Sequence, residues 1–231
     1  MPPRVLGVII GSDHERERTV DFTGEFETHL TVRCGERRLE ALARWAAAHG
    51  HGFAHIVLDR GRVVSQPMLT LRGTGTLAEV MAAAGRTAAA LRADGFEVTR
   101  SKVEAAPWNR GVPADDAEAA ELGPGRYFEH HLKLLLEPGF DAAALTALVA
   151  PHAARLSRNA RRVRADGVAE RFVTQRCRLV GAPAAERRLA ALVAALRERH
   201  HRIAEVEREF VVFDGDESLD DGWIDEREMG T

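Results

Sequence analysis

The sequence predicts an α+β protein in which one order of elements, βαββαβ, occurs twice along 231 residues. Two observations lead to this prediction. Short patterns of the first half recur in the same order in the second half, and strand-like and helix-like periodicities alternate in both halves. Hydrophobic residues make up 45% of the chain and charged residues 29%, which is typical of a globular protein with a substantial core.

The repeat rests on three pairs of short patterns. The spacing between the partners differs by a few residues from pair to pair, which a short insertion in the second half would explain. We therefore predict an internal duplication. The pairs are Phe26–Leu30 with Phe128–Leu132, Val64–Gln66 with Val173–Gln175, and Glu97–Arg100 with Glu205–Arg208.

The first half begins with an alternating segment, 26–33, which predicts a strand. Apolar residues at helical spacing then predict an amphipathic helix over 36–50, which ends in histidine and glycine. Segments 52–58 and 63–72 are rich in strand-forming residues. The turn residues Asp59, Arg60 and Gly61 lie between them, so we expect two adjacent strands.

A second helix is predicted over 76–94, because Thr76 is a suitable N-cap and Gly95 a suitable end. Segment 96–104 is the last expected strand of the first half. The second half has the same order of signals. It predicts strands over 127–136, 160–166, 171–180 and 203–213, and helices over 140–156 and 183–201.

The order βαββαβ is the ferredoxin-like motif, so we expect two tandem ferredoxin-like repeats. The connecting loop is rich in proline, glycine and acidic residues. The C-terminal tail is acidic, which is typical of a flexible segment, although Trp223 and Ile224 could hold it against the fold. The expected division is an N-terminal extension 1–24, repeat 1 over 25–104, the loop 105–126, repeat 2 over 127–213, and the tail 214–231.

Composition narrows the classes of function. The two cysteines, Cys34 and Cys177, exclude a disulfide framework. No apolar run approaches the ~20 residues of a membrane span, and the short apolar N-terminal stretch does not resemble a secretory signal, so we expect a cytoplasmic protein that does not bind membranes. A net charge of −3 disfavours binding of duplex nucleic acid. Only two of the 32 basic residues are lysines, Lys102 and Lys133, which makes each of them notable.

The first strand of each half carries the functional signal. Helices cover one face of a ferredoxin-like sheet, and the apolar residues of these strands belong to that face. Side chains alternate along a strand, so the polar residues share the opposite, open face. They are Glu27, His29 and Thr31 in the first half, and Glu129, His131 and Lys133 in the second.

The two open faces could stack on each other, or the two sheets could join edge to edge. Either arrangement predicts a pseudo-twofold cleft lined by the polar residues. Gln66 and Gln175 lie on strands that neighbour the first strands, so we expect them to face this cleft, and Arg158 is a further candidate for holding an anion. The same residues could instead form a purely structural polar interface between the two halves.

The segment His29-Leu30-Thr31-Val32 is similar to the HxTx motif of the two-histidine (2H) phosphoesterases. This resemblance implies that His29 and His131 act as general base and general acid, and that Thr31 holds a phosphate. The second half has Lys133 where that family has threonine or serine, and a lysine can bind phosphate as a point charge. The chain also resembles a bacterial family of tandem repeats with FETH and FEHH strands, which implies the repeat but no activity.

We therefore hypothesise an enzyme that acts on a small phosphorylated or otherwise anionic substrate without a cofactor. Gln66 and Gln175 would orient the substrate, while Glu27 and Glu129 would raise the pKa values of the histidines. A second hypothesis uses Glu27, His29, Glu129 and His131 as ligands of a divalent metal. A third is a non-catalytic protein that binds a small molecule or a partner. The sequence also leaves a homodimer open.

Overall fold

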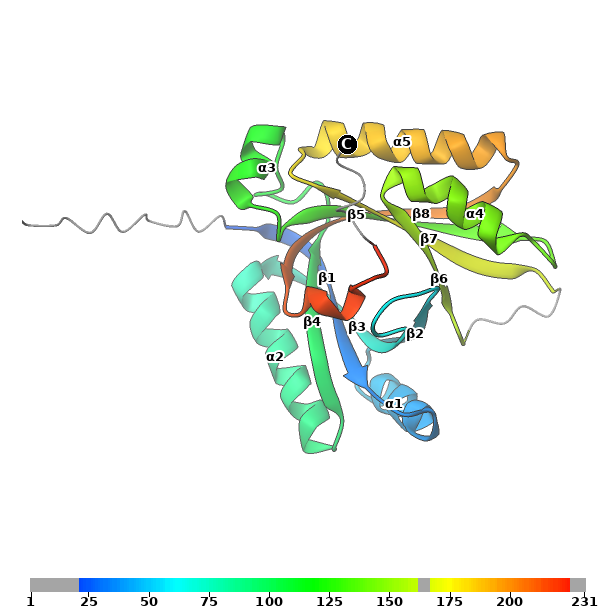
Figure 1. Ribbon diagram of the computed structural model, residues 1–231. Helices are drawn as coiled ribbons and strands as arrows, with labels where there is room; N and C mark the ends of the chain where they lie inside the picture. The colour runs from blue at the N-terminus through cyan, green and yellow to red at the C-terminus, as the bar shows by residue number, and fades with distance from the viewer. Residues whose placement is uncertain (1–20, 162–166, 225–231) are drawn as a thin grey trace, which may run out of the picture.

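The computed structural model describes residues 21–161 and 167–224, which form a closed eight-stranded antiparallel barrel with helices on its outside (Figure 1). Most of the predicted N-terminal extension lies outside the described residues, as do the last seven residues of the predicted tail, 225–231. The α+β class is confirmed, and each half of the chain has the element order βαββαβ.

The first half contains four strands and two helices, and the loop after it contains a third helix. These elements are β1 (Thr23–Arg33), α1 (Glu36–Ala48), β2 (Gly52–Leu58), β3 (Ser65–Thr76), α2 (Leu77–Ala93), β4 (Glu97–Ala105) and α3 (Asp116–Leu122). The predicted cap of the second helix is confirmed: the Thr76 hydroxyl accepts a hydrogen bond from the backbone of Glu79, whose carboxylate accepts one from the backbone of Thr76.

The second half repeats this order and ends in a 3₁₀ turn. Its elements are β5 (Tyr127–Leu136), α4 (Ala142–Val149), the 3₁₀ turn η1 (Ala150–His152), β6 (Ala154–Asn159), β7 (Ala169–Arg178), α5 (Ala182–Glu198), β8 (Arg202–Asp214) and the 3₁₀ turn η2 (Glu217–Asp220). The predicted helix 140–156 is wrong at its end. Pro151 lacks a backbone N–H, and Ala153 has a left-handed φ of 55°, so the helix stops and β6 begins at Ala154.

The two halves meet edge to edge. Around the barrel the strands follow the order β1-β3-β2-β6-β7-β5-β8-β4, and β4 pairs again with β1. Strands β2 and β6 join one pair of edges, with Val57 opposite Arg158, and strands β4 and β8 join the other, with Val103 opposite Phe213. Closure pairs all four sheet edges, and the predicted polar face becomes the interior of the barrel.

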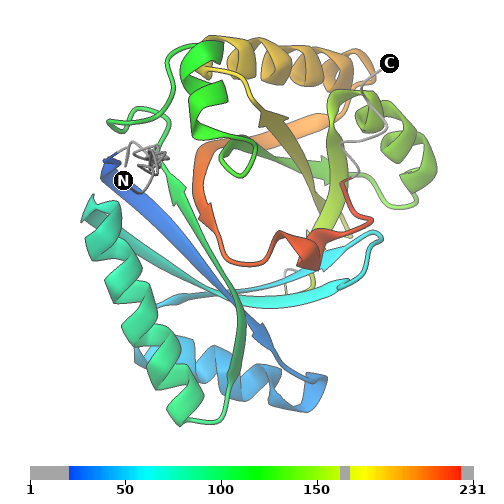
Figure 2. The same ribbon diagram turned by 60° about the vertical axis from the view of Figure 1, so that its left-hand side comes forward.

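The helices lie on the outside of the barrel (Figure 2). The apolar cores lie between them and the sheet. One core packs α1 and α2 on the first half around Leu30 and Leu69, and a second packs α4 and α5 on the second half around Leu132 and Val173. A third spans the β4–β8 seam and includes Phe210. None of the described helices is long and apolar enough to cross a membrane.

The described part of the C-terminal segment, up to Ile224, packs across one end of the barrel (Figure 1). Trp223 is 5% exposed, and its indole N–H donates to the carbonyl of Leu156 at 3.0 Å. The carbonyl of Asp221 accepts a hydrogen bond from the backbone of Arg62 at 2.7 Å. Trp223 therefore holds the segment, as the sequence suggested, and this end of the barrel is closed.

We expect Leu132→Ala to lower the free energy of unfolding by about 2–5 kcal/mol, because the side chain is fully buried beneath α5 and the substitution leaves a cavity. Chemical denaturation measures the change. Val64→Ala, at a side chain that is 39% exposed, is the control and should shift the value by less than about 1 kcal/mol. Equal losses in both variants would show that the second core does not stabilise the fold.

Candidate functional site

The barrel encloses a cavity of about 250 Å³ between two chemically different walls. One wall is charged and comes from β1, β4, β5 and β8. The other is largely apolar and comes from β2, β3 and β7, with Trp223 at the closed end. The charged wall includes Glu27, His29, Lys102, Glu129, His131 and Glu209, and the apolar wall includes Ala54, Ile56, Leu58, Met68 and Phe172.

Lys102 of β4 joins two carboxylates at the centre of the charged wall. Its ammonium lies 2.6 Å from Glu104 Oε1 and 2.6 Å from Glu129 Oε1. The other oxygen of Glu104 lies 2.9 Å from His29 Nε2. Although both oxygens of Glu104 are within reach of these cations, neither accepts a hydrogen bond of good geometry, and the side chain is fully buried.

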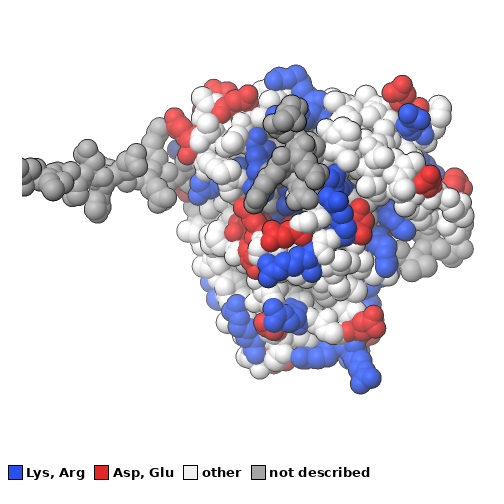
Figure 3. Space-filling model, in the orientation of Figure 1, with Lys and Arg blue, Asp and Glu red and all other residues white. Residues whose placement is uncertain are grey.

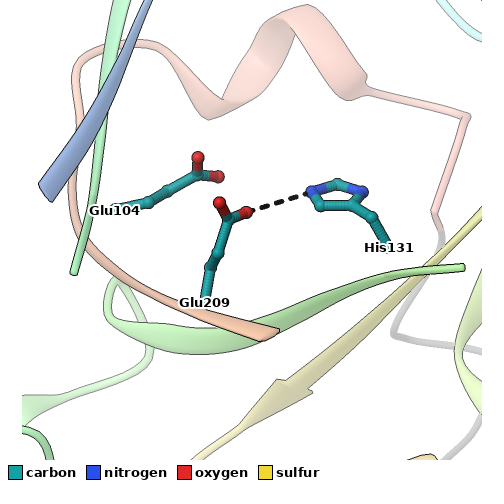
Figure 4. A group of neighbouring side chains, drawn as sticks. All are labelled: Glu104, His131 and Glu209. Atoms are coloured by element: carbon teal, nitrogen blue, oxygen red, sulfur yellow. Dashed lines mark ion pairs between the residues drawn. The ribbon is translucent and has the colours of Figure 1, made fainter. Parts of the chain in front are cut away.

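His131 lies on the other side of this group and faces two carboxylates. Its Nε2 atom is 3.2 Å from Glu129 Oε1. It is also 3.5 Å from Glu209 Oε2, the ion pair drawn in Figure 4. The Nδ1 atom of each histidine faces a threonine hydroxyl, at 3.0 Å for His131 with Thr174 and at 3.2 Å for His29 with Thr70. Each imidazole is thus held at both nitrogens, with Nε2 directed toward the carboxylates.

A second charged group lies at the closed end. The carboxylate of Asp220 accepts hydrogen bonds from Arg176 at 2.6 Å, Arg100 at 3.0 Å and Gln66 at 2.9 Å. Arg100 also binds Asp214, and Arg176 binds Glu129 at 2.7 Å. The η2 turn therefore inserts its own carboxylate between two buried arginines.

The neighbouring carboxylates decide the charge of both histidines. Burial by itself lowers the pKa of His131, but hydrogen bonds to Glu129 and Glu209 outweigh burial and raise it to about 10. Burial also lowers the pKa of His29, and the charge of Glu104 reverses this and raises it above the usual value. The imidazole of His131 is therefore protonated at neutral pH, and the carboxylate of Glu104 favours the protonated form of His29.

The pKa values of Glu104 and Glu209 shift in opposite directions. Burial raises the pKa of Glu104, but the charges of Lys102 and His29 overcome burial and lower it to about 2. Burial raises the pKa of Glu209, and the charge of Glu104 raises it further. The positive charge near Glu209 thus does not fully offset burial and the repulsion from the carboxylate of Glu104.

Glu104, His131 and Glu209 converge on one point (Figure 4). One ligand atom from each lies within 4.8 Å of the other two. Carboxylate oxygens and imidazole nitrogens are ligands of zinc, manganese and iron, and three such atoms at this spacing can hold one cation.

The structure brings seven of the nine predicted site residues to the cavity. Thr31 and Gln66 lie near its closed end, and Lys133 lies toward the other end, 3.8 Å from Glu170 and 3.9 Å from Glu205. Glu27 is held by Arg72 at 2.7 Å. The seven are Glu27, His29, Thr31, Gln66, Glu129, His131 and Lys133.

Two predicted site residues do not face the cavity. Gln175 points to the helix side of β7, where its side chain binds His130, the carbonyl of His152 and the carbonyl of Arg188. Arg158 is exposed on the outside of β6, because its neighbours Ser157 and Asn159 take the inward positions. The assignment of Gln175 and Arg158 to the site is therefore wrong.

The error at Gln175 comes from register. Thr70 lies opposite His29, and Thr174 lies opposite His131, so these two threonines occupy equivalent positions. Gln66 precedes Thr70 by four residues, so its counterpart is Glu170, four residues before Thr174. The predicted repeat paired Gln66 with Gln175, which lies an odd number of residues from the true counterpart. Because side chains alternate along a strand, this shift assigned Gln175 to the wrong face.

The last strand of each half was predicted, but none of its residues was assigned to the site. Glu104 and Glu209 complete the charged group around Lys102, which we call the central group. From the sequence, only Lys102 was notable, as one of two lysines. The signal was present: both strands carry charged residues at every second position, which indicates a polar inward face. These residues are Arg100, Lys102 and Glu104 in β4, and Glu205, Glu207 and Glu209 in β8.

We expect the imidazole of His131 to stay protonated up to a pH of about 10 in the metal-free protein, since its folded pKa is raised to about 10. His51 and His201, whose pKa values burial lowers, should lose their protons below pH 6.5. Nitrogen-15 NMR of the imidazole rings follows each titration. A His131 that titrates below pH 6.5 would contradict the ionised carboxylates around it.

We expect Asp220→Asn to destabilise the protein by about 3–5 kcal/mol, because it removes the anion that two buried arginines share. Thermal and chemical denaturation at neutral pH test this. The neighbouring Asp221→Asn is a matched control. The Asp221 side chain is 65% exposed and 3.8 Å from Arg62, so its loss should cost no more than about 1 kcal/mol. Equal effects would show that the buried contacts of Asp220 do not stabilise the closed end.

A comparison with protein-family models finds no match, and a comparison with curated proteins finds none either. Among solved structures, the chain is similar to the small subunit of acetolactate synthase from Thermotoga maritima, with 12% identity and a TM-score of 0.32 over 82% of this chain and 95% of that one. It is also similar to chlorite dismutase from Candidatus Nitrospira defluvii in complex with imidazole, with 14% identity and a TM-score of 0.26 over 82% and 91% of the two chains. With TM-scores this low, neither likeness carries an argument about the site.

Proposed function

We propose that this protein is a metal-dependent enzyme whose barrel interior holds one divalent cation between Glu104, His131 and Glu209. The observation that carries the proposal is the convergence of these three ligand atoms within 4.8 Å, on three different strands. Glu104 adds support, because its fully buried carboxylate has a pKa lowered to about 2 and is therefore ionised, as a metal ligand must be. A cation would satisfy both Glu104 and the carboxylate of Glu209 beside it.

Charge balance favours a divalent ion. Glu104, Glu129 and Glu209 bring three negative charges to the central group, and Lys102 brings one positive charge. Two negative charges remain. Protonated His29 and His131 would neutralise them in the metal-free state, and one divalent cation would do the same with both imidazoles neutral.

Three protein ligands leave part of a metal's coordination shell open, which is the arrangement of catalytic rather than structural sites. The open position would face the cavity, where a substrate or a water molecule could bind. The cation would polarise a bound oxygen or lower the pKa of a bound water. His29 lies 2.9 Å from Glu104. It would orient that ligand through this contact, or bind the metal itself.

Histidine acid–base chemistry on an anionic substrate remains a prediction, with less support from the geometry. Every lysine or arginine that lines the described cavity has a carboxylate within 3.9 Å, so an anion would have to displace one; these cations are Arg100, Lys102, Lys133 and Arg176. A two-histidine mechanism also needs one neutral imidazole as the base. The pKa values of His29 and His131 are both raised, which disfavours that role.

We also propose that the two halves arose by internal duplication, with a pseudo-twofold site between them. The support is the equal element order and the equivalent histidine–threonine pairs, His29 with Thr70 and His131 with Thr174. Two carboxylates of the central group are also in equivalent places: Glu104 lies on the last strand of the first half, and Glu209 on the last strand of the second half.

The experiment is to measure metal content by inductively coupled plasma mass spectrometry, followed by calorimetric titration of the metal-free protein with Zn²⁺ and Mn²⁺. We expect the wild type to bind close to one equivalent. Removing a ligand should weaken binding at least about tenfold in Glu209→Gln and His131→Ala. The control, Glu137→Gln, changes an exposed residue at the end of β5 and should bind as the wild type does.

Circular dichroism must first show that the variants fold. A folded wild type that takes up neither metal would overturn the proposal, as would equal affinity in Glu209→Gln and the wild type. In that case, phosphoester substrates would be screened next.

A further inference from the structure

The cavity combines an apolar wall with an excess of acidic groups. Ile56, Met68 and Phe172 line the apolar wall, and each is only partly buried although it points into the barrel. Apolar surface left uncovered inside a cavity is favourable for binding an apolar group of a ligand. At about 250 Å³, the space admits only a small molecule.

The rim of the barrel away from η2 is acidic. Glu27 lies there on β1, and Glu205 and Glu207 lie there on β8, where both are exposed. The basic residues nearby already have partners: Lys133 lies 3.8 Å from Glu170, and Arg72 binds Glu27 at 2.7 Å. The rim therefore attracts cations and repels anions.

A groove of about 620 Å³ continues from this rim along β1, β4 and β8, and it shares Glu27, Glu207 and Glu209 with the cavity. Trp108 borders the groove and is 73% exposed, the most exposed large hydrophobic side chain among the described residues. Its indole N–H lies 3.4 Å from Glu25. The fully buried Glu104, whose oxygens accept no hydrogen bond of good geometry, lines the groove at its inner end.

An indole face beside carboxylates is a favourable site for an ammonium group. Arg72 and Arg208 also line the groove, but Arg72 is paired with Glu27, and Arg208 is paired with Glu186 of α5 at 3.0 Å. Neither offers an unpaired positive charge to an anion.

We propose that the ligand of this site is a small organic cation, an amine or quaternary ammonium compound with an apolar body. The ammonium group binds between Trp108 and the rim carboxylates, and the apolar body lies along Ile56, Met68 and Phe172. This inference names the substrate class of the function proposed above and shares its cavity, but it uses none of the proposed metal ligands.

Three probes of equal body and different charge test the inference: phenethylamine, 2-phenylethanol and phenylacetate. Isothermal titration calorimetry on the full-length protein measures their affinities at low and at physiological salt. We expect phenethylamine to bind most tightly, the alcohol more weakly, and phenylacetate most weakly. Raising the salt concentration should weaken only the binding of the amine.

Two variants locate the binding site. Trp108→Leu should weaken phenethylamine binding by about two- to fivefold, which is the effect of an exposed cation–π contact. Glu207→Gln should weaken the amine by a similar factor and leave the alcohol unchanged. Trp45→Phe, at a tryptophan on α1 that stacks on His49, and Glu137→Gln are the matched controls and should bind as the wild type does.

Phenylacetate binding as tightly as phenethylamine, absence of phenethylamine binding, or unchanged affinity in both variants would overturn the inference. Metal content is measured on the same samples, so the two proposals can fail separately. A protein that binds metal but not the amine contradicts only the substrate class. One that binds the amine but no metal contradicts only the metal-dependent function.

Discussion

The closure of the barrel is the constraint on which the rest of the structure depends. Two strand pairings, β2 with β6 and β4 with β8, turn two open sheets into one closed sheet. A side chain on the inner face then has no direct route to bulk water at the closed end. Every charge placed there must find an opposite charge within the barrel, since an unpaired buried charge costs several kcal/mol.

This constraint explains the paired arrangement of the interior. Arg100 and Arg176 hold Asp220, and Lys102 holds Glu104 and Glu129. Such networks contribute little net stability, because desolvation opposes the attraction between the charges. The stability of the fold comes from the three apolar cores outside the barrel. An interior that is so highly charged, and not needed as a core, is best explained by a function in binding or catalysis.

The sequence predicted the class and element order because these depend on local periodicity. Alternation along 26–33 and 127–136 also placed His29 and His131 on one inner face correctly. The sequence could not decide how the two sheets meet, since edge pairing depends on contacts between residues about a hundred positions apart. It failed at Gln175 because matching a three-residue pattern does not fix register, and a shift by an odd number of residues reverses the face of a strand.

The two ends of the barrel differ in charge, and this difference gives the site a direction. At the closed end, η2 supplies a carboxylate to two arginines, and Trp223 seals the gap beside Leu156, so charge there is already satisfied. On the face around η2, at the closed end, charged residues of both signs mix (Figure 3). Toward the other end, acidic groups outnumber their basic partners. The electrostatic potential inside the barrel therefore becomes more negative with distance from η2.

A cation that enters at the acidic rim meets Glu209 and Glu104 before it reaches Lys102, and the buried ammonium of Lys102 repels it from going deeper. This field favours the proposed position of the metal between the rim and Lys102, with the proposed substrate on the side of the rim.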